Sequence, residues 1–353
     1  MLTLLYLILI LGVLVFVHEF GHFLAAKACH VYVSEFAIGM GPKLFSFKRK
    51  NKNDPTEYSL RLFPIGGFCA MAGEVDEDNK ELKLKKSEYM CNRSKWERFL
   101  ILIAGVTMNI ILAFVILFIQ ALIWGYSEQK SVVGYAPEGY PISDAGIEVG
   151  DRIKEVNGIK VNTWDKLTIV INLKNKDNKY EFVVEKKDGS IKKYDVTPKI
   201  TTDEKGNETK IFGVGVGDTT YSGFGNAIKY AFVKLGSIVS SMWLIITSLI
   251  KGSLGLSSLS GPVGMYTVVG QSAKIGFQSI LYLTAYLSVN LAVINAIPFP
   301  AFDGGRILFV VIEAIKGSKV NPKVENTFHT VGFFLLMLLM VYITIQDIIR
   351  IAG

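Results

Sequence analysis

Residues 1–29 read MLTLLYLILILGVLVFVHEFGHFLAAKAC, an apolar run interrupted by His18, Glu19 and His22. The first 17 residues carry no charge. A stretch of about 18 or more mainly apolar residues is long enough to cross a bilayer as an α-helix. The sequence therefore predicts a membrane span with three ionisable side chains inside it.

The composition of the whole chain indicates a multispanning membrane protein. Half of the 353 residues are hydrophobic and 20% are charged, the mean hydropathy is +0.36, and the apolar residues are clumped. We expect four spans, at about 2–29, 99–124, 276–299 and 329–349. Three cysteines are too few for a disulfide scaffold, and the composition excludes disorder and a collagen-like fibre.

Another apolar segment, residues 229–250, is interpreted as a helix lying in the membrane interface. It carries Lys234 and three serines between residues 237 and 241, which suit lipid exposure poorly. If it crossed the bilayer, residues 276–299 would run in the opposite direction, and their C-terminal end would lie on the outer face of the membrane.

The basic residues indicate the topology. The net charge is +7, and 13 Lys and Arg residues lie between Val31 and Arg98, whereas none precedes His18. Cytoplasmic loops carry an excess of Lys and Arg, so this loop is predicted to be cytoplasmic and both termini extracytoplasmic. Acidic residues are mixed with the basic ones, so we expect no nucleic-acid partner.

His18, Glu19 and His22 form an H-E-x-x-H motif within the first span. Residues four apart share one face of a helix, so both imidazoles can converge on one metal ion, beside a Glu that can accept a proton from a water that the metal activates. Ionisable residues are costly inside a span and generally mark a function. At a rise of about 1.5 Å per residue, His18 lies about 24 Å along the helix, in the cytoplasmic part of the bilayer.

A catalytic zinc ion takes three protein ligands, and three residues are candidates for the third. His30 follows the first span and His329 opens the last one; we interpret both as interfacial or solvated residues. Asp303 stands in NAIPFPAFDGG (residues 295–305), where two prolines break the helix and two glycines free the backbone at membrane depth. Because spans one and three both end on the cytoplasmic side, Asp303 can meet the two motif histidines and is the predicted ligand.

These residues resemble the site-2 protease family of intramembrane zinc metalloproteases, in its bacterial RseP/RasP type. HEFGH matches the family's H-E-x-G-H motif, and NAIPFPAFDGG matches N-x-x-P-x-P-x-L-D-G with Phe302 in place of Leu. Residues 64–74 match the hairpin that follows the first span, and SGPVG (residues 260–264) matches a segment ahead of the third. GVTMN (residues 105–109) keeps the Asn of G-P-x-x-N but lacks its Pro, a departure that concerns a local kink and not the chemistry.

The charged segment after the second span resembles a PDZ domain. SDAGIEVGDRIKEVNG (residues 143–158) looks like the bacterial PDZ pattern A-G-L-x-x-G-D-x-I-x-x-I-N-G. Its turn signals at 150–151 and 157–158 flank a short predicted strand. PDZ folds can bind an extended peptide at a sheet edge, although the family resemblance implies a size gate over the active site.

The family resemblance also implies roles for individual residues. His18, His22 and Asp303 would hold one Zn²⁺, and Glu19 would be the general base. The hairpin glycines would let an extended substrate backbone approach closely. The residues implied in substrate binding are Asn290, Asn295, Pro298, Pro300, Gly66 and Gly67.

The implied reaction is hydrolysis of a peptide bond in or near the transmembrane helix of single-pass membrane proteins, such as anti-sigma factors or remnant signal peptides, in regulated intramembrane proteolysis. The implied location is the bacterial cell membrane, with the active site near the cytoplasmic side and the PDZ domain outside. Two other classes stay open, namely a catalytically inactive PDZ-bearing scaffold and a metal-dependent transporter, although transporters usually show a repeated half.

The expected fold is an α-helical membrane protein of four transmembrane helices with a small cytoplasmic β-hairpin element and an inserted α+β PDZ domain. Residues 1–125 would form the first half of the metalloprotease core, and 126–205 the PDZ domain. Residues 206–275 would form an interfacial helical region, and 276–353 the second half of the core.

Overall fold

The computed structural model describes residues 2–48, 56–74, 84–173, 178–202, 208–217 and 220–352. Residues 49–55 and 75–83, which carry part of the predicted positive charge bias, lie outside the described residues. The chain divides into two compact units, Met1–Ala113 with Ser260–Asp347 and Phe114–Leu259 with Ile348–Gly353.

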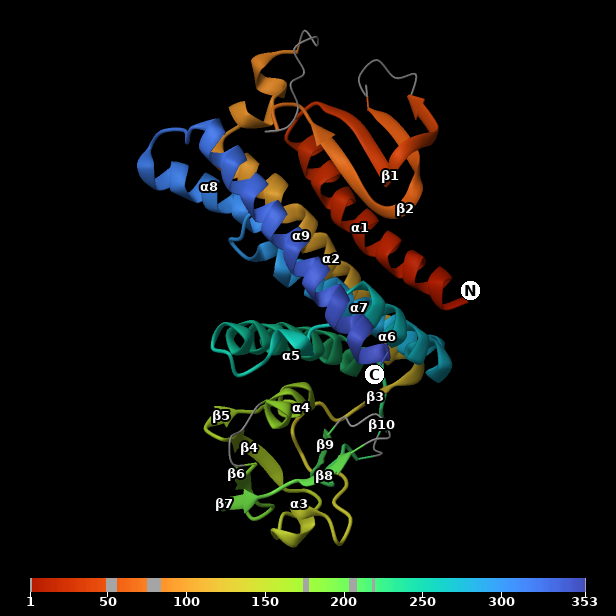
Figure 1. Ribbon diagram of the computed structural model, residues 1–353, viewed down its shortest axis with the longest axis vertical. Helices are drawn as coiled ribbons and strands as arrows, with labels where there is room; N and C mark the ends of the chain where they lie inside the picture. The colour runs from red at the N-terminus through yellow and green to blue at the C-terminus, as the bar shows by residue number, and fades with distance from the viewer. Residues whose placement is uncertain are drawn as a thin grey trace. The chain divides into compact units, whose positions relative to one another are not determined.

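The first unit contains α1 (Leu2–Ala28), β1 (Val33–Lys48), β2 (Glu57–Met71), the short 3-10 turns η1 (Lys86–Glu88) and η2 (Met90–Asn92), most of α2 (Lys95–Trp124), α6 (Pro262–Ile275), α7 (Phe277–Ala296), α8 (Asp303–Lys316) and most of α9 (Pro322–Ala352) (Figure 1). The second unit contains β3 (Tyr126–Ser127), α3 (Pro141–Asp144), β4 (Arg152–Val156), β5 (Ile159–Lys160), α4 (Trp164–Asn172), β6 (Tyr180–Glu185), β7 (Ile191–Val196), β8 (Lys199–Thr202), β9 (Glu208–Ile211), β10 (Thr220–Tyr221), α5 (Phe224–Ile250) and η3 (Leu256–Ser258).

Helix α1 is apolar around most of its surface but buries one stripe. The buried positions Ile10, Leu14, His18, His22 and Ala26 recur every four residues. This spacing places them on one face of an α-helix. Their neighbours include α6 and α7, which pack on the first half of the stripe. The two motif histidines therefore point into the protein and not toward lipid.

The β1–β2 sheet lies alongside α1 (Figure 1), and each of its strands is used in two halves. Residues 33–38 of β1 pair with 67–71 of β2 on one side and with 57–60 on the other. Residues 43–48 pair with the far side of 57–61. Residues 67–71 therefore form one edge of the sheet, which we call the edge strand, and no other strand among the described residues pairs with its outer side.

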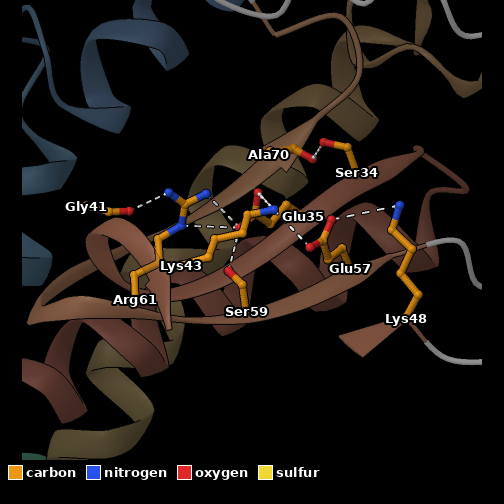
Figure 2. Close-up of polar contacts among 9 residues, drawn as sticks. All are labelled: Ser34, Glu35, Gly41, Lys43, Lys48, Glu57, Ser59, Arg61 and Ala70. Carbon is orange, nitrogen blue, oxygen red and sulfur yellow. Dashed lines mark hydrogen bonds and ion pairs between the residues drawn. The ribbon is translucent and has the colours of Figure 1, made fainter. Parts of the chain in front are cut away.

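A charged cluster ties the halves of this sheet together (Figure 2). Arg61 Nη2 donates to Glu35 Oε1 at 2.8 Å, the Ser59 hydroxyl donates to the same oxygen, and Lys43 Nζ lies 3.2 Å from Glu35 Oε2. Burial raises the pKa of Glu35, but the hydrogen bonds from Ser59, Arg61 and Lys43 outweigh it and hold that pKa below its usual value. Lys43 also bonds Glu57 at 2.9 Å. The cluster joins the inner strand to the two segments that lie away from the edge strand.

The second unit has a four-stranded antiparallel sheet in the order β5-β4-β6-β7. Its core combines alternate residues of these strands with α4 and includes Tyr180, Phe182 and Val184. Phe212, which lies beyond residue 205, belongs to the same core. The predicted strand at 152–156 and the turns around it are present, since β4 is Arg152–Val156 and Asn157 and Gly158 have positive φ.

Five helices in the described part of the chain are long and apolar enough to cross a membrane, namely α1, α2, α5, α7 and α9. The prediction of a largely helical, multispanning membrane protein with small β-sheets is confirmed. By length and composition alone, α5 joins the four expected spans.

Candidate metal centre

Three side chains converge on one point in the first unit. His18 Nε2 lies 3.0 Å and His22 Nε2 3.3 Å from Asp303 Oδ2, and the two Nε2 atoms are 3.2 Å apart. Tetrahedral zinc with ligand bonds of about 2.0–2.1 Å separates its ligand atoms by about 3.3 Å. His18, His22 and Asp303 could therefore hold a zinc ion. In the described part of the chain, these three form the cluster of potential metal ligands.

Both imidazoles are oriented by partners on α2. His22 Nδ1 lies 2.8 Å from the carbonyl oxygen of Ile101, which can only accept, so Nδ1 carries the proton and Nε2 is left as a ligand. His18 Nδ1 lies 3.3 Å from the amide of the fully buried Asn109. The rings of the two histidine ligands are therefore held in fixed orientations.

Glycines make the space that these rings occupy. A Cβ at Gly105 of α2 would lie 2.4 Å from His22 Nε2 and 2.8 Å from His18 Cε1. A Cβ at Gly21 of α1 would lie 2.5 Å from the Ala104 carbonyl oxygen, so α1 and α2 approach backbone to backbone. GVTMN at 105–109 thus supplies both the room for the imidazoles and the partner of His18. The sequence analysis identified this motif, but it predicted no role for Gly105 or Asn109.

Asp303 is brought to the histidines by the end of α7 and the start of α8. The residue that caps α8 is Phe302, so Asp303 is not the helix N-cap. Cβ atoms at Gly304 and Gly305 would lie 2.2 Å and 2.4 Å from carbonyl oxygens of the preceding loop, which explains the two glycines. Asp303 Oδ2 is buried and has no hydrogen-bond donor among the described residues. A buried carboxylate oxygen facing two imidazole nitrogens suits a divalent cation.

Glu19 and the edge strand border the same cavity, of about 810 Å³. Glu19 accepts a backbone hydrogen bond from Cys69, and a Cβ at Gly67 would lie 3.8 Å from Glu19 Cγ. The consecutive residues 68–71 all line the cavity. Successive side chains of a strand point to opposite faces, so consecutive lining residues mean that the edge of the strand, and not one face, borders the cavity.

One of the other predicted site residues, Asn295, contacts this centre. Asn295 Nδ2 lies 3.4 Å from His18 Nε2, whereas Asn290 has a buried side-chain oxygen without a hydrogen-bond partner among the described residues. Gly66 has positive φ, and a Cβ there would meet Met40. Pro298 stands in the loop after α7, and Pro300 packs against α9.

The two alternative histidine ligands lie in different places. His30 follows α1, where its carbonyl oxygen accepts a hydrogen bond from Arg93 at 2.7 Å. His329 was interpreted as an interfacial residue, but it lines the cavity together with Glu19 and Asp303. Its Nδ1 lies 3.1 Å from the backbone nitrogen of Ala301.

Comparison with known proteins agrees with this geometry. The model of peptidase family M50 matches residues 6–339. The chain belongs to this family, the site-2 proteases. A protein of Clostridium perfringens is 37% identical over 349 residues, 97% of both chains. The regulator of sigma-W protease RasP of Bacillus subtilis is 32% identical over 423 aligned positions, which cover 99% of this chain and 98% of that protein, and the zinc metalloprotease RasP of Bacillus licheniformis is 31% identical, with 99% of both covered.

The predicted family, enzyme class and cofactor are therefore confirmed. The protein is a zinc metalloprotease and a multi-pass bacterial membrane protein. A transporter does not account for membership in a peptidase family, and the intact group of His18, His22 and Asp303 argues against a catalytically inactive scaffold.

Proposed function

We propose that this protease cleaves a peptide bond in or near the transmembrane helix of single-pass membrane proteins, with the substrate held in extended form. The observation that carries the proposal is the edge strand, whose outer side pairs with no other strand among the described residues and borders the cavity that contains Glu19 and Asp303. A helix shields its peptide bonds, and an unpaired strand edge offers main-chain donors and acceptors to an extended peptide.

The chemistry follows from the four central residues. His18, His22 and Asp303 hold the zinc ion, which supplies Lewis-acid polarisation and lowers the pKa of a water. Glu19 takes the proton of the attacking water and delivers it to the leaving amine. The backbone hydrogen bond from Cys69 keeps the Glu19 carboxylate next to the strand that carries the substrate.

The loop and strand residues position the substrate. Gly67 has no side chain to separate the edge strand from α1, where Val15 and Glu19 are its neighbours. Gly66, which has a positive φ, turns the chain just before Gly67. Asn295, whose amide borders the metal position, contacts the substrate backbone near the scissile bond. Asn290, Pro298 and Pro300 shape the loop and helix behind that contact.

The second unit supports the proposal of a PDZ domain outside the membrane, at residues 126–205, followed by an interfacial helix. Lys234 Nζ of α5 lies 2.7 Å from Asp165 Oδ1, and the Ser237 hydroxyl lies 2.7 Å from both Asp165 Oδ2, to which it donates, and the Thr163 hydroxyl. Leu244 of α5 packs on the core of the same domain. A helix whose buried face is bonded to a water-soluble domain along this stretch lies in the interface, so four helices cross the membrane.

The proposed topology follows from four spans. Both termini and the PDZ domain are extracytoplasmic, and the β1–β2 sheet and the metal centre lie at the cytoplasmic side. The PDZ domain limits access to substrates already shortened outside. One relative is named regulator of sigma-W protease, which favours membrane-bound anti-sigma factors as substrates here, with remnant signal peptides as a second group.

Strand pairing is tested with synthetic transmembrane substrates that carry one N-methylated amide at successive positions around the cleavage site. N-methylation removes a main-chain donor without changing the side chain. We expect cleavage to fall strongly at every second position, because a strand presents alternate amides to each neighbour. A loss of cleavage without this period of two, or no loss, contradicts strand addition while leaving the zinc chemistry intact.

A further inference from the structure

The loop that carries Asp303 contains one strained residue. Ala301 has a φ of 71°, a left-handed conformation that residues other than glycine adopt rarely and at a cost in energy. Pro298 and Pro300 remove two backbone donors from the same loop. Contacts from outside the loop can therefore stabilise this conformation and help to hold Asp303 at a fixed place.

Helix α9 supplies one such contact through a hydrogen bond. The N–H of Ala301 donates to His329 Nδ1 at 3.1 Å. Because a backbone N–H can only donate, Nδ1 is the acceptor atom of the imidazole. The His329 ring is itself packed against the rings of Phe309 and Phe328, with centroids 6.0 Å and 5.6 Å away. The acceptor is thus presented from a fixed ring.

The second contact is steric and lies one turn further along α9. A Cβ at Gly332 would lie only 1.8 Å from Pro300 Cβ. The backbone of α9 therefore touches the loop directly at this point. His329 and Gly332 are three residues apart and share one face of the helix. We call this pair the loop seat.

We propose that His329 is a positioning residue which, with Gly332, holds Ala301 in its left-handed conformation and so sets the place of Asp303 against His18 and His22. His329 acts through the loop and not as a zinc ligand. The inference rests on Asp303 being a ligand, as proposed above. It differs from the expectation that His329 is an interfacial residue without influence on the site.

The test uses zinc affinity, measured on the full-length protein in detergent by competition with a chelator. His329→Ala removes the acceptor and is expected to weaken zinc binding about 10-fold or more, as loss of an orienting partner does. His329→Asn places an amide oxygen near the position of Nδ1 and is expected to stay within about threefold of the parent. The control Val331→Ala alters an exposed residue on α9 and should change nothing.

A second substitution makes the test specific for the strained conformation. Glycine adopts positive φ readily, so Ala301→Gly should restore much of the zinc affinity in the His329→Ala protein. It should have little effect alone. Failure of this rescue, or an Asn variant as weak as the Ala variant, overturns the proposal.

Two further variants keep the result interpretable. If His329→Ala does not fold, Gly332→Ala should still weaken zinc binding, because its methyl group displaces Pro300; unchanged affinity contradicts the loop seat. Asp303→Ala separates the two proposals. If Asp303→Ala retains zinc, the ligand assignment is wrong. If it loses zinc but the His329 variants keep the zinc affinity of the parent, only the proposed role of His329 is wrong.

Discussion

The amide of Asn109 lies 3.3 Å from Nδ1 of His18, on the side of the imidazole that faces away from Asp303. When Nε2 binds a metal, Nδ1 carries the proton, and a hydrogen-bond acceptor is required opposite it. Asn109 Oδ1 is buried without a partner among the described residues. These facts favour the amide orientation in which Oδ1 accepts from Nδ1–H. Separately, the backbone carbonyl oxygen of Asn109 accepts a hydrogen bond from the Ser288 hydroxyl of α7 at 2.8 Å.

Replacing Asn109 by Ala should weaken zinc binding by about 10- to 100-fold, the usual effect of removing the partner of a ligating histidine. Zinc affinity of the purified protein is the measurement. Thr107→Ala is the matched control, because this exposed residue of α2 bonds only within its own helix. Equal zinc affinities for the two variants would show that Asn109 does not support zinc binding.

Replacing Glu19 by Gln should abolish cleavage of a membrane-embedded model substrate and leave one zinc ion per chain. The amide keeps the shape of the side chain but cannot accept a proton from water. General-base catalysis of this kind typically contributes about 10²- to 10⁴-fold to the rate. Metal analysis and a cleavage assay on the same preparation decide the matter, and near-normal turnover contradicts the role of Glu19.

Asp303→Ala should lower zinc content and activity together, since two histidines alone leave the ion under-coordinated. Asp303→Asn keeps the volume and one oxygen but loses the charge that offsets Zn²⁺, so it should bind zinc weakly. His30→Ala is the control, because His30 is not among the residues that form the ligand group. Full zinc content in Asp303→Ala contradicts the assignment.

The four-span topology can be tested by labelling single cysteines in a background without Cys29, Cys69 and Cys91. A membrane-impermeant reagent added from outside should label Cys at position 178, in the domain that we propose to be extracytoplasmic. It should not label Cys at position 318, in the loop between α8 and α9. Labelling of position 318 from outside would mean that α5 crosses the bilayer.

The charged cluster of the β1–β2 sheet predicts a pH dependence of stability. The pKa of Glu35 is held below its usual value in the folded protein, so its ionised form stabilises the sheet above the unfolded pKa of about 4.3, and this contribution is lost as the pH falls through the folded pKa. Hydrogen bonds to a charged group contribute about 1.5–3 kcal/mol. Glu35→Gln should therefore lower Tm at pH 7 by several degrees.

The same comparison at low pH provides the control. As the pH falls below the unfolded pKa of about 4.3, the Tm of the parent should approach that of Glu35→Gln, because the stabilisation from the ionised Glu35 is progressively lost. Glu181→Gln, which removes a carboxylate paired with Lys193 on the exposed surface of the other unit, should cost little at either pH. A Glu35 difference that is independent of pH contradicts the electrostatic role of the cluster.

The sequence alone predicted the membrane class and all four central residues. Spans are read from apolar length, since the bilayer imposes a minimum number of helical residues. His18, Glu19 and His22 are local to one helix, where a spacing of four residues fixes a common face. Asp303 also followed from the sequence, because its helix-breaking surroundings and the direction of the spans placed it at the same side.

Only the tertiary structure decided which residues support this centre. Asn109 and Gly105 matter because α2 packs backbone to backbone on α1, and nothing in their own segment states which helix they will face. His329 is 26 residues from Asp303 along the chain, and its contact with Ala301 depends on how α9 crosses the loop after α7. Pairing of β1 and β2 in two halves likewise depends on long-range register, which leaves residues 67–71 with an open edge beside Glu19. Local periodicity encodes what a segment becomes, whereas the packing of distant segments determines what each side chain meets.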